Sequence, residues 1–169
     1  MEYLIKHNHQ TRGKEQRIYN SRGDLLLTMS EKLSSISGKE VIYNKSNEIV
    51  YLIDTFQQKG HFQSTIYDAS SKEILTVYLS NKYSGLNLYV SSMYNMYSVT
   101  HTLDMGTIHI HREGEVVATL QMKKSLFSNN YVLDVNPYQD EEFLQLFAIV
   151  ITKLLENKSE ELLAISNAY

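Results

Sequence analysis

The sequence predicts a mainly β protein, in which a closed antiparallel barrel of about twelve strands is wrapped around a central hydrophobic C-terminal helix. Two observations lead to this fold class. The first is a phrase that recurs every 24 residues, as Ile18-Tyr19-Asn20, Ile42-Tyr43-Asn44 and Ile66-Tyr67-Asp68. The second is the segment 143–151, where Gln145 is the only polar residue. Together they indicate repeated hairpins and a helix that needs complete burial.

The repeated phrase is typical of β-hairpins. An Ile-Tyr pair suits a pleated, half-buried strand, and Asn or Asp begins a turn through its own side-chain hydrogen bond. We therefore expect hairpins at about 15–29, 40–54 and 63–80. Because successive side chains of a strand point to opposite faces, we also expect the Ile and the Tyr of each pair to face opposite ways.

Alternation and turn residues predict the remaining strands. A further hairpin turns at Glu113-Gly114, and the last strand leads into Asn136-Pro137, where Asn suits a helix cap and Pro the first helical position. The strands expected outside the repeat are Tyr3–His7, Leu86–Val90, Met96–Thr100, the hairpin Thr107–Met122, and Tyr131–Val135.

The helical segment decides the architecture. Its apolar residues cover nearly the whole circumference, so the helix must be buried on all sides. The sequence contains no second long helix, and a sheet of around eleven strands can hold a central helix. We expect one domain over 1–169, with the barrel at about 1–136, the central helix at about 137–157, and an acidic amphipathic tail at 158–169.

Composition excludes several classes of protein. The net charge of −3 lacks the basic footprint that nucleic acid requires, and the absence of cysteine excludes disulfides and thiolate metal sites. The longest apolar stretch, Phe143–Leu155, is about 13 residues long, whereas a membrane span needs roughly 20. Since the first residues also lack the pattern of a signal peptide, we expect a cytoplasmic protein without a membrane span.

At this point the chain resembles the Tubby C-terminal-like superfamily, which includes the plant LURP-one-related proteins, the phospholipid scramblases and small bacterial relatives. The resemblance is carried by 108–123, by 130–137 with the apolar helix after it, and by Tyr67–Ile74. It implies a twelve-stranded barrel around a central helix, and we take the chain for a small bacterial member.

The resemblance implies less about activity. Tubby domains bind phosphoinositide headgroups through positioned Lys and Arg, and scramblases are membrane-attached proteins linked to lipid movement. This chain has no Cys for S-acylation and no hydrophobic span. No specific lipid-binding Lys/Arg pair can be aligned onto it, so the resemblance supports the fold more than the function.

Basic residues gather in two places. Three of the four arginines lie within eleven residues, and a second, smaller patch follows later in the chain. Guanidinium groups suit phosphate or carboxylate, so an anionic headgroup could dock at these residues. The alternative is ordinary solvated surface charge. The candidate ligand-binding residues are Arg12, Lys14, Arg17, Arg22, Lys123 and Lys124.

Neither a metal site nor a catalytic site is predicted. His7 and His9, like His109 and His111, share a strand face and could each supply two ligands, with His61 and His101 to complete a site. However, no Asp or Glu is spaced to complete the coordination. The sequence also lacks a Gly-x-Ser-x-Gly phrase, a phosphate-binding loop and a dinucleotide fingerprint. We therefore expect no enzyme and no cofactor.

The sequence-based hypothesis is a soluble, non-catalytic binding or scaffold domain that recognises an anionic ligand such as a phospholipid headgroup. The alternative is a structural module for protein–protein interaction or oligomerisation. That module would use either the tail or the aromatic region Tyr83–Tyr97, which is otherwise explained as barrel wall. Salt-sensitive binding to liposomes would favour the first hypothesis, and a salt-tolerant oligomer or protein partner the second.

Overall fold

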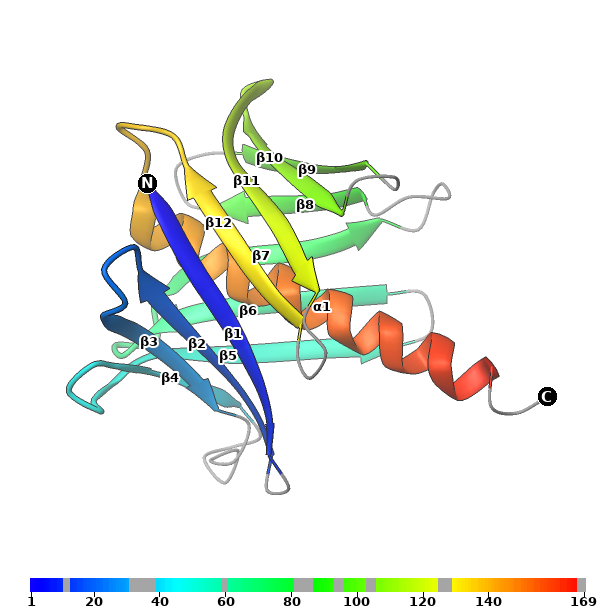
Figure 1. Cartoon of the computed structure of the whole chain (residues 1–169), viewed down its shortest axis with the longest axis horizontal. Coiled ribbons are helices and arrows are strands. Elements are labelled where there is room, and N and C mark those ends of the chain that lie inside the picture. Colours follow the sequence, from blue (N-terminus) through cyan, green and yellow to red (C-terminus); the bar gives the residue numbers. More distant parts are fainter. Residues whose placement is uncertain are drawn as a thin grey trace.

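The computed structural model describes residues 1–10, 13–30, 39–58, 61–80, 87–92, 96–102, 106–124 and 129–166. Over these residues the chain forms twelve strands and one helix (Figure 1). The strands are β1 (Glu2–Gln10), β2 (Gly13–Asn20), β3 (Leu25–Ser30), β4 (Glu40–Asn44), β5 (Ile49–Gln58), β6 (His61–Asp68), β7 (Glu73–Ser80), β8 (Asn87–Ser92), β9 (Met96–Thr102), β10 (Thr107–Arg112), β11 (Glu115–Lys124) and β12 (Asn129–Val135), and the helix is α1 (Glu141–Ser166).

All strands belong to one antiparallel sheet. Each strand from β2 to β12 pairs with the strand before it in the chain, and β1 pairs with both β2 and β12. The hydrogen-bonded order is therefore β1-β12-β11-β10-β9-β8-β7-β6-β5-β4-β3-β2. The predicted class, a mainly β protein with one C-terminal helix, is confirmed.

The 24-residue phrase is the start of a recurring hairpin. Ile18, Ile42 and Ile66 are completely buried, whereas the tyrosine after each of them is only partly buried. The strand pairing shifts between the Ile and the Tyr in all three copies, which marks a β-bulge before the turn. The prediction that Ile and Tyr face opposite ways is confirmed.

The last residue of each phrase holds its turn. Asn20 Oδ1 accepts hydrogen bonds from the backbone N–H groups of Arg22 and Asp24, both at 2.9 Å. The same two bonds recur at the other repeats, from Ser46 and Glu48 to Asn44 Oδ1 and from Ser70 and Lys72 to Asp68 Oδ1. The predicted role of Asn and Asp in these turns is confirmed.

The helix begins at Glu141 and not at Pro137, so the predicted start is wrong. Tyr138 has a φ of 66°, in the left-handed region, and a right-handed helix cannot pass through such a residue. Asp140 caps the helix instead, because its Oδ1 accepts a hydrogen bond of 3.0 Å from the Phe143 N–H. The Asn136 side chain donates to the Val116 carbonyl oxygen and so anchors the end of β12.

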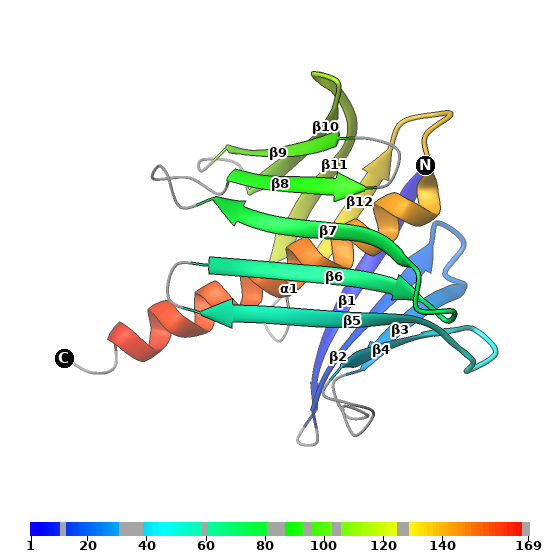
Figure 2. The same ribbon diagram turned by 180° about the vertical axis from the view of Figure 1, so that it is seen from behind.

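Helix α1 lies on the concave side of the sheet. In two opposite views it runs between β1, β11 and β12 on one side and β5, β6 and β7 on the other (Figures 1 and 2). Every residue from Phe143 to Leu154 is buried. The helix continues to Ser166, across the expected boundary between helix and tail. The proposed division of a single domain into barrel, helix and tail stays a prediction.

In the part of the chain that the structure describes, no helix is both long and apolar enough to cross a membrane. The buried residues of α1 also include two charged ones, Lys153 and Glu156, which follow its apolar part.

Candidate ligand-binding site

Four residues from four neighbouring strands form a row across the outer face of the sheet. Lys6 of β1 lies opposite Arg17 of β2 on one side and opposite Asn130 of β12 on the other. Asn130 in turn lies opposite Lys123 of β11. Neighbouring strands are about 4.8 Å apart, so the row spans roughly 14 Å. We call these four residues the cationic row.

Alternation along each strand turns the row outward. The neighbours Ile5, Gln16 and Tyr131 are buried, so Lys6, Arg17 and Asn130 take the opposite face. Lys6 and Lys123 are exposed to solvent. Three cationic side chains and one amide therefore line up on a single accessible surface.

Two contacts fix the centre of the row. Arg17 Nε lies 2.8 Å from Glu15 Oε1, and this hydrogen bond is the main reason that the pKa of Arg17 is raised above its ordinary value. Lys6 Nζ lies 5.1 Å from the centre of the Tyr19 ring, within the range of a cation–π contact. The Arg17 side chain stays charged and is oriented by Glu15, while the Lys6 ammonium lies beside the Tyr19 ring.

A hollow of about 230 Å³ lies over the row. Its polar lining is rich in hydrogen-bond donors, because Lys and Arg only donate and the Asn amide can donate twice. The residues around it are Lys6, His7, Asn8, Arg17, Tyr19 and Asn130. An anionic group is the chemistry that this lining fits best.

Of the six candidate residues from the sequence, two fall on the cationic row, namely Arg17 and Lys123. Lys14 belongs to the same strand as Arg17, but an odd spacing of three residues places it on the opposite face by alternation. Arg22 is exposed in the turn after β2, away from the row. The structure therefore does not bring Lys14, Arg17 and Arg22 together on one face of the sheet.

Two candidate residues lie outside what the structure describes. Arg12 falls in the gap between β1 and β2, and for Lys124 only the strand position is described. Sequence reasoning missed Lys6 and Asn130, which join Arg17 to Lys123. The signal for Lys6 was the alternation Ile5-Lys6-His7, whereas nothing local could place Asn130 beside it.

On the inner face, directly behind the row, lies a buried polar contact. His7 Nδ1 is 2.8 Å from Glu156 Oε2, with only 2% and 6% of the two side chains exposed. The Tyr131 ring packs edge-on against the His7 ring, with the ring centres 5.3 Å apart. Burial, and then the negative charge of Glu156, raise the pKa of Tyr131. This contact ties the second half of α1 to β1.

A second charged contact ties the same part of the helix to β4. Lys153 Nζ pairs with Glu40 Oε1, and both side chains are largely buried. At the other end of α1, Tyr3 and Tyr51 donate hydrogen bonds to Glu141 and Glu142. These contacts place the helix within the sheet.

The histidine pairs do not come together as a metal site in the described residues, where no group of three or more metal-ligating side chains occurs. The ring centres of His109 and His111 on β10 lie 6.4 Å apart. In the sheet, β12 and β11 separate β10 from β1, which carries His7. The side chains of His9, His61 and His101 lie outside the described part.

The aromatic region is described only in part. Tyr97 is buried and stacks on Phe143 of the helix, with ring centres 4.6 Å apart, as a wall residue would. Its neighbour Met96 is 68% exposed. The other side chains of Tyr83–Tyr97 and those of the tail lie outside the described part, so their use as an interaction surface stays a prediction.

Comparison with known proteins gives a match to a family and a match to a fold. The family model described as LURP-one-related matches residues 2–152. The X-ray structure of a protein from Arabidopsis thaliana is similar with a TM-score of 0.61, over 90% of this chain and 91% of that one. Its sequence is 15% identical, so this likeness shows the fold alone. No curated protein matches the chain.

The family match covers every strand and the first part of α1, up to residue 152, and it includes the cationic row. The resemblance to the Tubby-like group of families is thus confirmed, while a bacterial source stays a prediction. The chain belongs to the LURP-one-related family.

Proposed function

We propose that the protein is a non-catalytic binding domain that recognises an anionic group, such as the phosphate of a phospholipid headgroup, at the cationic row. The expectation of a soluble, cytoplasmic domain without enzymatic activity belongs to the same proposal. Membership in the LURP-one-related family is consistent with it and names no ligand.

The observation that carries this proposal is the pairing of like charges. Lys6 and Arg17 lie directly opposite each other on neighbouring strands, and Lys123 follows two strands further on. Like charges opposite each other in a sheet are destabilising. Glu15 pairs with Arg17 Nε and offsets part of that repulsion. A bound anion would relieve the rest, and Arg17 and Asn130 would add N–H donors.

The packing of the helix supports a site on the outside. Side chains of α1 such as Phe147 and Ile151 are completely buried against the inner face of the sheet. Barrels that bind small molecules usually do so in the lumen, which is filled in this chain. A ligand would therefore meet the outer face of β1, β2, β11 and β12.

We also infer that the sheet closes into a barrel around the helix. The five residue pairs between β1 and β12, from Glu2–Asp134 to Lys6–Asn130, support closure, because they join the first strand to the last. Hydrogen exchange would test this inference. Closure predicts slow exchange both for the β1 amides that face β2 and for those that face β12, as for the amides of β6. Fast exchange confined to the amides that face β12 would contradict closure.

Vesicle co-sedimentation tests the binding proposal. We expect the protein to bind vesicles containing phosphatidylglycerol at low salt, and to bind less as ionic strength rises. The double variant Lys6→Glu/Lys123→Glu reverses two exposed charges of the row and should weaken binding about tenfold or more.

The matched control is Lys45→Glu/Lys72→Glu, which makes the same change of net charge at exposed positions in the β4–β5 and β6–β7 turns. It should change binding by less than about twofold, because both positions lie outside the row. Equal losses in the control and in Lys6→Glu/Lys123→Glu would show a response to net charge alone, and the proposed site would be wrong.

A further inference from the structure

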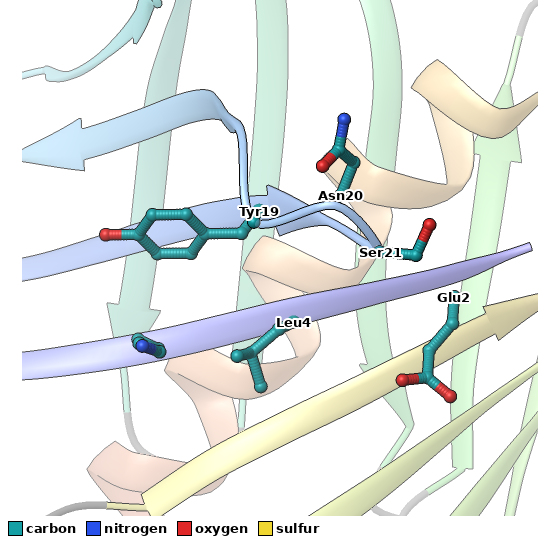
Figure 3. Close-up of a pocket in the computed structure, with 7 residues that line it drawn as sticks. Glu2, Leu4, Tyr19, Asn20 and Ser21 are labelled. Carbon is teal, nitrogen blue, oxygen red and sulfur yellow. The ribbon is translucent and has the colours of Figure 1, made fainter.

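The outer face of the sheet differs between the two sides of α1. Beside β1 and β2, a second hollow of about 290 Å³ adjoins the one over the cationic row, and Figure 3 shows Glu2, Asn20 and Ser21 around it. Its lining mixes charged, amide and hydroxyl groups. Strands β5, β6 and β7 lie on the other side of α1 (Figure 2), and their outer face carries exposed aromatic side chains instead.

The strand register aligns these aromatic residues. Phe56 of β5 and Tyr78 of β7 are 56% and 44% exposed, and each lies opposite Gln63 of β6, which is also exposed. The neighbours Phe62 and Val77 are buried, so Gln63 and Tyr78 take the outer face by alternation. We call Phe56, Gln63 and Tyr78 the β5–β7 row.

The two aromatic residues lie well inside their strands, on an accessible face of the sheet. Aromatic side chains are enriched in surfaces that bind other proteins, and an aligned pair is more informative than single exposed residues. Among the described residues, the other exposed large apolar side chains lie at or beside a strand end or outside the strands, namely Met1, Ile49, Met96, Val116 and Tyr138.

The spacing of the two aromatic residues matches one peptide conformation. Neighbouring strands are about 4.8 Å apart, so positions two strands apart are separated by roughly 9.6 Å. A polyproline II helix has three residues per turn and rises about 3.1 Å per residue, so its side chains repeat at roughly 9.3 Å. Every third residue of such a segment would therefore meet an aromatic ring of the β5–β7 row.

The chemistry of the row suits the same ligand. A polyproline II segment has no internal hydrogen bonds, so its backbone carbonyl groups are available as acceptors. The Gln63 amide and the Tyr78 hydroxyl can each donate a hydrogen bond, and the Phe56 and Tyr78 rings offer flat apolar surface to proline. Aromatic-lined surfaces are a recurrent means of binding proline-rich segments.

Charge on this part of the sheet favours a basic segment. The sequences of β5, β6 and β7 contain no Lys or Arg. Asp54 is exposed two residues before Phe56 on β5, which places it on the same face at about 7 Å along the strand. The Lys39 ammonium lies over the Tyr67 ring, about 13 Å along β6 from the row. A basic residue beside the prolines would therefore pair with Asp54.

We propose that the β5–β7 row binds a proline-rich, basic segment of a partner protein in the polyproline II conformation. The segment crosses β5, β6 and β7, with prolines against Phe56 and Tyr78 and a basic side chain at Asp54. Because this surface is separate from the cationic row, the proposal goes beyond the proposed function and does not depend on it.

Titration with a synthetic peptide tests the proposal. The peptide has nine prolines with one arginine at each end, and the backbone amide resonances of Phe56, Gln63 and Tyr78 are followed by NMR. We expect saturable shifts at these residues. A comparison peptide of equal length and charge, with glycine and serine in place of proline, should bind about fivefold or more weakly, because a flexible chain must be ordered on binding. Equal binding of the two peptides would overturn the proposal.

Variants locate the binding surface. Phe56→Ala/Tyr78→Ala removes both rings of the row and should weaken binding of the proline peptide about tenfold or more. The matched control, Ile49→Ala/Met96→Ala, removes two exposed apolar side chains outside the row and should change binding by less than about twofold. All four side chains are exposed, so both variants should keep the fold, which circular dichroism checks. Equal losses in the two variants would overturn the proposed site.

The acidic residue has a smaller expected effect. Asp54→Asn should weaken binding about two- to threefold and make it less sensitive to salt, as loss of one exposed ion pair would. Unchanged affinity and salt dependence would contradict a basic partner.

Other results would identify a different surface or ligand. Shifts confined to residues outside β5, β6 and β7 would overturn the proposed location. Saturable binding of cellohexaose at the row, without binding of the proline peptide, would indicate a carbohydrate site and overturn the proposal. Failure of the proline peptide to bind would also overturn it and leave the cationic row in place, because phosphatidylglycerol vesicles test that row separately.

Discussion

The two parts of the buried stretch of α1 are equally hidden from solvent but are held in different ways. From Phe143 to Ile151 the helix is apolar apart from Gln145, and its side chains pack against the strands and against each other. In the next turn and a half, Lys153 pairs with Glu40 and Glu156 with His7. The first part is held by apolar packing and the second by charged contacts.

The difference separates stability from orientation. A fully buried Leu, Ile or Phe contributes about 1.5–3 kcal/mol by leaving water, so the apolar part supplies most of the stabilisation. Buried ion pairs roughly offset their own desolvation, and among the described residues His7 Nε2 and Gln16 Oε1 are buried without hydrogen-bond partners. We expect the polar part to add little net stability.

What the polar part provides is a defined position. A helix that is apolar all round buries apolar surface in any rotation. Burial alone therefore does not favour one rotation over another. Two charged contacts to β1 and β4 favour one rotation and one depth. Because β1 also carries Lys6, the His7–Glu156 contact lies directly behind the cationic row.

The largest expected effect comes from the apolar part. Phe147 is completely buried between Tyr97 and Phe143, with ring centres 6.5 and 6.4 Å away. Phe147→Ala removes the ring and leaves a cavity, which should lower the free energy of unfolding by about 3–5 kcal/mol. Urea denaturation measures this loss.

The matched control makes the same substitution on the outer face. Phe56 is 56% exposed on β5, so Phe56→Ala should cost less than about 1 kcal/mol. Equal losses at the two positions would contradict the view that the apolar part of α1 dominates stability.

A smaller effect is expected when the polar contact is broken. Glu156→Leu removes the partner of His7 and places an apolar side chain against a buried imidazole, so it should cost about 3 kcal/mol. The double variant His7→Leu/Glu156→Leu replaces both polar groups and should recover most of that loss, because a buried pair can often be replaced by apolar residues.

Unfolding in urea compares the single and double variants. If the double variant is as unstable as the single one, the charged contact contributes net stability, and the contrast between the two parts of the helix is wrong. The double variant should also show broader NMR resonances for α1, since one of the two charged contacts of its polar part is gone.

Most of the fold could be predicted because its signals are local. The repeated Ile-Tyr-Asn phrase contains both the strand alternation and the turn, and each Ile is buried as expected. The apolar circumference of residues 143–151 indicated complete burial before any strand partner was known. The start of the helix could not be predicted, because it depends on the positive φ of Tyr138. Tyrosine rarely adopts a positive φ, so the sequence does not indicate one there.

The candidate site was harder to predict because it depends on register between distant strands. Arg17 and Lys123 were both identified by charge, but only the pairing of β1 with β12 places them in one row. A shift of one residue in that pairing would turn the row to the inner face. The odd spacing of Lys14 from Arg17 already indicated that the two side chains take opposite faces of β2.

The smallest expected effect concerns the first turn of α1. A partly buried hydrogen bond lies there, next to the apolar part of the helix. Tyr3 donates its hydroxyl to Glu141, and burial, followed by this bond and the charge of Glu141, raises the pKa of Tyr3 to about 12 from the usual 10.0. The folded state keeps this proton while the unfolded state loses it, so stability should fall as pH rises from about 10 to 12.

Tyr3→Phe removes that titration and the hydrogen bond. At pH 7 the variant should be about 1 kcal/mol less stable, and between pH 10 and 12 its stability should fall less steeply than that of the unchanged protein. Tyr51 and Tyr131 also have raised pKa values and leave a residual slope in both proteins. Urea midpoints at pH 9 and pH 11 measure the difference. Equal slopes would mean that the Tyr3 hydroxyl is not held by Glu141 in solution, and that the start of the helix is positioned by its apolar residues and the Asp140 cap alone.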